Sequence, residues 1–200
     1  MSSLEQPRYT PAQYLELERL ASYKSECLHG EIFAMAGTSY EHALVVANIL
    51  GELRAALRHG PCRAVANNLR VQAADAEMFT YPDVVVICGP PQFTDAALDT
   101  LLNPTVLVEV LSPSTELYDR GEKFAYYRQL SSLTNYVLVA QSKMRVEHYA
   151  RQGAQWVLSI LEHPADTLTL PSAECALSLA SIYENIPFGT PAPPSKGTTA

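Results

Sequence analysis

The stretch Val106-Leu-Val-Glu-Val-Leu-Ser-Pro-Ser-Thr115 places the carboxylate of Glu109 inside an apolar run. The run lies between Pro104 and Pro113 and is rich in Val and Leu, which is typical of a short strand covered on both faces. An unpaired ionised carboxylate in such a strand would cost several kcal/mol. Glu109 therefore has a buried partner, a chemical role, or both.

Length and composition bound the architecture and the partners. With 200 residues, 48% of them hydrophobic, the chain suits one domain over residues 1–188, and the Pro-, Gly-, Ser- and Thr-rich end over 189–200 suits a disordered tail. The sequence shows no apolar stretch of membrane-spanning length and no secretory leader, which favours a cytoplasmic protein. The net charge of −7 argues against coating nucleic acid by bulk electrostatics, but not against an acidic site that holds a cation.

The four cysteines are scattered along the chain, without a CxxC pair or a His at zinc-finger spacing: Cys27, Cys62, Cys88 and Cys175. This pattern indicates neither a disulfide scaffold nor a structural zinc site. We expect all four to be small core residues.

Hydrophobic periodicity predicts alternating helices and strands. Helices are expected after Thr10-Pro11, over residues 40–59 and from 114 or 115 to about 130. Strands are expected over 30–37, 81–89, 105–111 and 135–140, with 62–66 and 69–74 forming a meander, and 145–151 with 154–162 forming an exposed hairpin across Gly153. The order predicts an α/β (α+β) fold in which a mixed central sheet is flanked by helices.

Two carboxylates stand at special places in this pattern. Asp83 opens one buried strand and Glu109 lies in the middle of another, so the two converge if these strands are neighbours. Converging carboxylates supply the hard oxygen ligands that Mg²⁺ prefers. Lys123 follows Asp119 by one helical turn, and a lysine beside such a site can orient water or offset the charge of a phosphate.

Simpler interpretations exist for each of these residues. Asp83 can cap a strand, Glu109 can form a buried ion pair, and Lys123 can pair with Asp119 on a solvated helix face. His42, at the start of a long helix, can serve as a cap. Aromatic residues on an amphipathic helix more often belong to the core than to a base-stacking platform, which applies to Tyr118, Tyr126 and Tyr127.

The motifs "YPDVVVI", "VLVEVLSPST" and "YDRGEKFAYYRQLSSLTNYVLV" resemble the successive motifs of the Uma-type putative endonuclease family of the PD-(D/E)XK nuclease superfamily. The resemblance extends from "LHGEIFAMAG" and Glu41-His42 to "SIYENIPF". It implies a restriction-endonuclease-like core with a carboxylate-bound Mg²⁺ or Mn²⁺. Asp83 would be the Asp of the motif and Glu109 the Glu of its (D/E)XK element. The residue two after Glu109 is Leu111, not Lys, so the resemblance implies that Lys123 takes the role of the motif lysine.

The resulting hypothesis is a metal-dependent endonuclease. Asp83, Glu109 and the Val110 carbonyl would bind the metal, while Lys123 would position the attacking water. Glu31, His42, Asp119 and Gln141 are second-tier candidates. DNA is the expected partner and a homodimer the expected assembly, since enzymes that cut both strands often pair two sites. The alternatives are a catalytically silent module that binds nucleic acid or a protein, and a hydrolase of another phosphorylated molecule.

Overall fold

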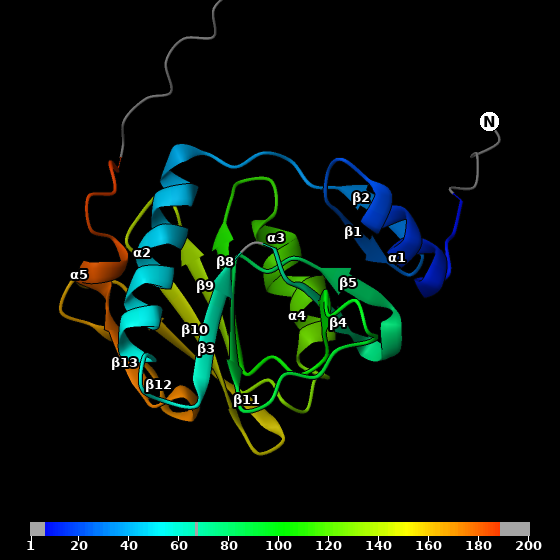
Figure 1. Ribbon diagram of the computed structural model, residues 1–200. Coiled ribbons are helices and arrows are strands. Elements are labelled where there is room, and N and C mark those ends of the chain that lie inside the picture. Colours follow the sequence, from blue (N-terminus) through cyan, green and yellow to red (C-terminus); the bar gives the residue numbers. More distant parts are fainter. Residues whose placement is uncertain (1–6, 67, 189–200) are drawn as a thin grey trace, which may run out of the picture.

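A six-stranded mixed sheet forms the centre of the computed structural model, which describes residues 7–66 and 68–188 (Figure 1). Its strand order is β11-β10-β9-β8-β6-β3, with β8 and β9 parallel and the other neighbours antiparallel. The strands are β3 (Cys62–Ala66), β6 (Val84–Cys88), β8 (Val106–Leu111), β9 (Asn135–Ala140), β10 (Val146–Gln152) and β11 (Gln155–Leu161). The mixed sheet and the β10–β11 hairpin confirm the predicted fold class. The tail predicted over 189–200 lies outside the described residues.

A second sheet of five strands has the order β2-β1-β5-β4-β7. Its strands are β1 (Ser25–Leu28), β2 (Glu31–Ala34), β4 (Arg70–Ala73), β5 (Met78–Thr80) and β7 (Thr100–Leu101). The predicted meander of 62–66 with 69–74 is therefore wrong, because β3 pairs with β6 in one sheet and β4 pairs with β5 and β7 in the other. Cys62 on β3 packs in the hydrophobic core that contains the buried residues of α2, whereas Val71 on β4 packs in a separate hydrophobic core. The two strands therefore belong to different sheets.

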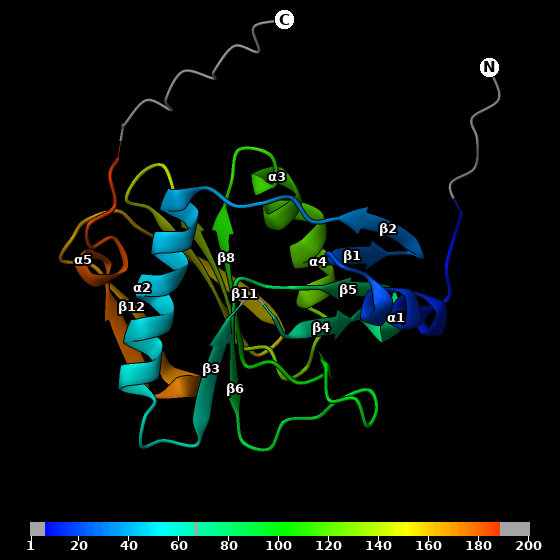
Figure 2. The same ribbon diagram turned by 45° about the horizontal axis from the view of Figure 1, so that its top comes forward.

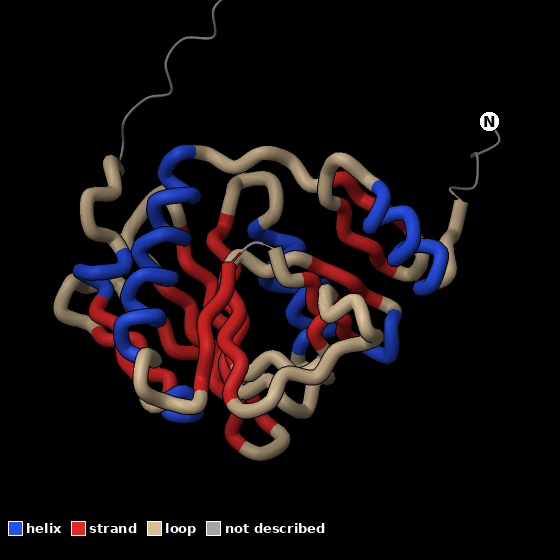
Figure 3. Tube along the Cα trace, in the orientation of Figure 1, coloured by secondary structure: helices blue, strands red, loops and turns tan. Residues whose placement is uncertain are grey.

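Helices lie on the outer sides of the two sheets and also between them (Figure 3). They are α1 (Pro11–Leu20), α2 (Tyr40–Ala56), α3 (Glu116–Tyr118), α4 (Phe124–Tyr127) and α5 (Leu179–Ile182), with a π-helical turn η2 (Asp119–Lys123) and 3₁₀ turns η1 (Ala74–Ala76) and η3 (Pro171–Ala173). Thr10 caps α1 in a capping box with Gln13, and Ser39 caps α2 through the His42 amide. Both predicted helix starts are confirmed. The helix predicted over 114–130 is instead α3, η2 and α4 in succession.

The central sheet separates two hydrophobic cores. One face packs against α2, α5 and the small hairpin of β12 (Thr167–Leu170) and β13 (Cys175–Ser178), and the other packs against α4 and the second sheet (Figure 2). Along β8, Val106, Val108 and Val110 join the first core, whereas Leu107 and Leu111 join the second. Because side chains alternate along a strand, Glu109 points to the second face.

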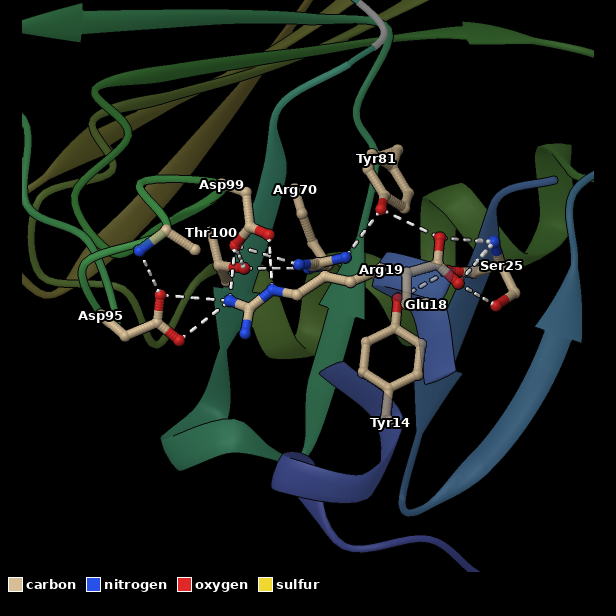
Figure 4. Close-up of polar contacts among 10 residues, drawn as sticks. Tyr14, Glu18, Arg19, Ser25, Arg70, Tyr81, Asp95, Asp99 and Thr100 are labelled. Atoms are coloured by element: carbon tan, nitrogen blue, oxygen red, sulfur yellow. Dashed lines mark hydrogen bonds and ion pairs between the residues drawn. The ribbon is translucent and has the colours of Figure 1, made fainter. Parts of the chain in front are cut away.

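A polar network fastens α1 to the second sheet (Figure 4). The buried Glu18 carboxylate accepts a hydrogen bond from the Tyr81 hydroxyl at 2.9 Å, and that hydroxyl accepts one from Arg70 Nη1 at 2.8 Å. At the end of the same helix, Arg19 Nε donates to Asp99 Oδ2 at 2.8 Å. These contacts fix the chain near Tyr81, two residues before Asp83.

The expectation that all four cysteines are unpaired core residues is wrong for two of them. Cys62 and Cys88 form a disulfide between β3 and β6, where the strand register sets them directly opposite each other. Cys27 and Cys175 are free and buried, as expected. Within the described residues, no helix combines the length and apolar character that crossing a bilayer requires.

Candidate active site

A cavity of about 570 Å³ opens where residues of both sheets come together. Its walls come from β1 and β2, the linker of residues 35–39, the chain around Asp83, the end of β8, and the segment from Ser112 to Lys123. Six of its charged lining residues are Glu26, Asp83, Glu109, Asp119, Glu122 and Lys123. The cavity thus collects the three residues that the sequence singled out for catalysis.

The register of β6 and β8 brings Asp83 and Glu109 together. Val84 pairs with Val108 in this antiparallel ladder, so Asp83, one residue earlier, stands opposite Glu109, one residue later. Asp83 Oδ2 accepts a hydrogen bond from the Val110 amide at 2.7 Å, and Asp83 Oδ1 lies 2.9 Å from His42 Nε2. The Asp83 carboxylate is held from two sides beside Glu109.

Glu109 has a lysine and a tyrosine as partners. Its Oε1 lies 3.0 Å from Lys123 Nζ and accepts a hydrogen bond from the Tyr127 hydroxyl at 3.0 Å. Lys123 Nζ also lies 3.1 Å from Glu26 Oε1 and 3.6 Å from Asp119 Oδ1. The buried ion pair expected for Glu109 is therefore present, and it lies inside the cavity rather than on a solvated face.

Burial and crowding of like charges shift the pKa values of this cluster. Burial raises the pKa of Glu109 well above its ordinary value; Lys123 opposes this, and the nearby Asp119, Asp83 and Glu26 add to it. Burial also raises the pKa of Asp119. For Lys123, burial acts downward, but the surrounding Glu109, Tyr127, Glu26 and Asp119 outweigh it, so its pKa lies well above the ordinary value. The cluster has more carboxylates than cations, an imbalance that a bound cation would relieve.

The second-tier candidates separate into two groups. His42, Asp119 and Gln141 line the cavity, and Gln141 Oε1 accepts a hydrogen bond from the Ser39 hydroxyl at 3.2 Å. Glu31 is not among the lining residues; its carboxylate lies 3.6 Å from Arg8 Nη2 and is 37% exposed.

The acidic group from the N-terminal half is Glu26, which the sequence interpretation missed. The available signal was a carboxylate inside the short, largely buried strand "SECL". Of the three tyrosines assigned to the core, Tyr127 is fully buried, and Tyr118 and Tyr126 are partly buried and pack against the second core. Tyr118 also lines the cavity, and Tyr126 also contacts His29.

The donor set suits a metal bound by two carboxylates. Mg²⁺ is usually held through one or two carboxylates and keeps several waters. Both contacts of Glu109 with described residues use Oε1, so Oε2 can serve as a ligand. Across residues 7–66 and 68–188, no three His, Cys, Asp or Glu side chains gather as a group able to hold a metal ion. The residues fit a water-rich Asp83–Glu109 site and not a closed protein cage.

Comparisons with known proteins agree with this architecture. The family model of Uma2, described as putative restriction endonuclease, matches residues 11–181. Two proteins of Synechocystis sp. are similar: uncharacterized protein sll1609, 37% identical over 76% of this chain and 86% of its own, and uncharacterized protein slr1290, 33% identical over 91% and 95%.

A solved structure shares the fold. It is a putative nuclease belonging to DUF820 from Anabaena variabilis, with a TM-score of 0.69 at 19% identity, covering 88% of this chain and 97% of its own. Taken with the match over residues 11–181, these likenesses show that the chain belongs to the Uma2 family of putative restriction endonucleases.

Proposed function

We propose that this protein is a divalent-metal-dependent endonuclease that hydrolyses phosphodiester bonds, with Mg²⁺ or Mn²⁺ bound by Asp83 and Glu109. The observation that carries the proposal is the meeting of three groups in one cavity. Asp83, directly before β6, stands opposite Glu109 on β8, and Lys123 Nζ lies 3.0 Å from Glu109 Oε1. Family membership supports the reaction class.

The protein groups around the carboxylates orient them. His42 and the Val110 amide hold Asp83, while Lys123 and Tyr127 engage Glu109 Oε1 and not Oε2. The Val110 carbonyl stays a predicted third ligand. A bound Mg²⁺ would supply Lewis-acid polarisation of a phosphoryl oxygen and lower the pKa of a coordinated water.

Lys123 is placed to act on the same centre. Its ammonium is buried and held by Glu26, Glu109 and Asp119, which fixes the positive charge at the cavity lining. A fixed positive charge there can offset negative charge that develops on a phosphate during hydrolysis. Leu111 occupies the position of the motif lysine on β8, and we assign the role of that lysine to Lys123.

DNA is the proposed substrate, because the family is described as putative restriction endonuclease and restriction endonucleases cut DNA. A homodimer is the proposed assembly, since the two-fold dimer is the commonest oligomer of soluble proteins.

One observation favours a second candidate function, a nuclease fold that binds its ligand without cleaving it. Lys123 is the only Lys or Arg among the described residues that line the cavity, and three carboxylates surround it. A Lys so tightly paired can serve the fold rather than a phosphate. Cleavage assays distinguish the two candidates.

The test is cleavage of plasmid and of single-stranded DNA in Mg²⁺ or Mn²⁺. We expect the wild type to cleave, and Asp83→Asn, Glu109→Gln and Lys123→Met each to lose at least 100-fold in rate. Glu31→Gln is the matched control, since it neutralises a carboxylate outside the cavity wall. Metal binding without cleavage by the wild type would favour the silent module, and cleavage that survives in Glu109→Gln would refute the proposed site.

A further inference from the structure

The cavity wall formed by β2 and the following linker is apolar and solvent-accessible. Phe33 is 52% exposed and Met35 is 40% exposed, although both line the cavity. Leu28, Ala34 and Ala36 extend the same wall. Large apolar side chains left open beside a polar site are typical of ligand contact.

Strand register connects this wall to the catalytic groups. Phe33 on β2 pairs directly with Glu26 on β1, and paired residues of an antiparallel ladder project to the same face. Glu26 Oε1 in turn lies 3.1 Å from Lys123 Nζ, which contacts Glu109. Phe33 is thus connected to the proposed metal ligand Glu109 through its strand partner Glu26 and then through Lys123.

The linker that carries Met35 is fastened at both ends. The Met35 amide donates to the Lys24 carbonyl at 3.0 Å, and the Ser39 hydroxyl donates to Gln141 Oε1 at 3.2 Å. All five residues 35–39 line the cavity, and in Figure 2 the linker runs from β2 toward α2 across the upper side of the molecule. The apolar wall is therefore built before any ligand arrives.

The charge of the cavity opposes a grip on duplex backbone. Among the described lining residues, five are acidic and Lys123 is the only Lys or Arg. Proteins that hold duplex DNA neutralise many phosphates with Lys and Arg. A single strand also carries phosphates, but each of its unpaired bases adds a flat face that stacks on aromatic side chains, a contact that the paired bases of a duplex do not offer.

We propose that the wall of Phe33 and Met35 receives an unpaired base of single-stranded nucleic acid, whose neighbouring phosphate lies at Asp83 and Glu109. This inference rests on the proposed function and adds its substrate class. The cavity volume of about 570 Å³ is within the range of pockets that bind small molecules, so one nucleotide fits it in size. An unpaired nucleotide meets both walls, with its phosphate on the acidic, metal-binding side and its base on the apolar side.

The test is fluorescence anisotropy with labelled single-stranded DNA, the duplex of the same sequence, and the matching RNA strand, in EDTA and in Ca²⁺. We expect the wild type to bind the single strand at least 10-fold more tightly than the duplex. Phe33→Ala should weaken single-strand binding roughly 10-fold, Met35→Ala should weaken it less, and Phe33→Trp should retain it. Preference for either sugar supports the inference, because both strands present unpaired bases.

Phe188→Ala is the matched control, since Phe188 is 42% exposed and does not line the cavity. Calorimetric Mg²⁺ titration of the same proteins distinguishes failure of this inference from failure of the proposed function. Equal affinity for single strand and duplex, or unchanged binding by Phe33→Ala, with Mg²⁺ binding intact, overturns this inference alone. A wild type that binds no metal overturns the proposed function and this inference together.

Discussion

Glu109 Oε1 lies 3.0 Å from the Lys123 ammonium and accepts a hydrogen bond from the Tyr127 hydroxyl, also at 3.0 Å. The Tyr127 hydroxyl also lies 2.6 Å from Thr80 Oγ1, and because its one proton goes to Glu109, Thr80 is the donor in that contact. Tyr127 is fully buried. It therefore acts as a positioning residue that fixes the rotation of the Glu109 carboxylate.

Replacing Tyr127 by Phe keeps the ring and removes only this hydroxyl. We expect Mg²⁺ affinity to fall about 10-fold, because groups that orient a metal ligand typically contribute that much. The free energy of unfolding should fall by about 1 to 2 kcal/mol, since Thr80 and Glu109 each lose a buried partner. Calorimetry and urea unfolding measure the two effects.

The control is Tyr14→Phe, which removes another buried hydroxyl that donates to the Ser25 carbonyl at 2.6 Å. It should reduce stability without changing metal affinity. Equal metal affinities for the Tyr127→Phe protein and the wild type would contradict the positioning role.

The sequence singled out Asp83 and Glu109 because each carboxylate stands at a definite place in a buried strand, and Lys123 because of its spacing from Asp119 and the family resemblance. Glu26 was missed since its four-residue strand is too short to show a period. Glu31 was favoured instead, but it begins β2 and turns to Arg8. Which of two nearby acids enters a cavity depends on hairpin register, which a single sequence does not specify.

Among the elements, the π-helical turn η2 carries Asp119 and Lys123, both buried in the site. Such turns contain one extra residue relative to an α-helix and occur often at functional sites. Gly121 lies in this turn, and a Cβ added there would find no atom within 4 Å.

Gly121 therefore offers two variants with opposite expectations. Gly121→Ala should leave metal binding unchanged and the free energy of unfolding unchanged or raised by up to about 1 kcal/mol. Deleting Gly121 should restore an α-helical repeat and rotate Lys123 and Tyr127 relative to Asp119, which abolishes metal binding. Circular dichroism and calorimetry test both, and a deletion variant that binds Mg²⁺ normally would contradict the role of the turn.

The same helical segment is tied to β10 through Glu147, which is 5% exposed. Burial pushes the pKa of Glu147 upward, but hydrogen bonds from Arg120 and Arg145 outweigh it, so the pKa lies below its ordinary value. A lowered pKa in the folded state contributes stability above the unfolded-state pKa of about 4.3, and this contribution is lost as the pH falls below it.

Glu147→Gln should therefore cost about 2 kcal/mol of unfolding free energy at pH 7 and less at pH 3. Glu162→Gln, at the exposed end of the same network, should change little at either pH. Urea unfolding at the two pH values provides the measurement. A loss that is equal at both pH values would show that Glu147 acts by packing alone.

The helix α2 was predictable from its helical spacing of apolar residues, and the buried strands β6, β8 and β9 from their continuous apolar runs. The π turn was not, because "YDRGEKFAYY" fits an ordinary helix as well. Strand pairing was also hidden, since β3 and β4 are consecutive in the chain but join different sheets. The Cys62–Cys88 disulfide follows from the β3–β6 register and could not be read without it.

At the scale of the whole molecule, the homodimer stays a prediction. Light scattering of the purified protein at micromolar concentration should report twice the chain mass of 21.9 kDa. A single species at the monomer mass would remove it. That result would agree with a single-strand substrate, which needs only one cleavage site.

The proposed activity depends on one centre, the opposed carboxylates of Asp83 and Glu109 beside Lys123. Isothermal calorimetry of Mg²⁺ or Mn²⁺ binding to the wild type, Asp83→Asn, Glu109→Gln and the control Glu31→Gln tests it most directly. We predict one site per chain in the wild type and in Glu31→Gln, and none in the two site variants at the same metal concentrations. Wild-type protein that binds no metal, or site variants that bind as the wild type does, would contradict the account and leave Glu109 as the acid of a buried ion pair.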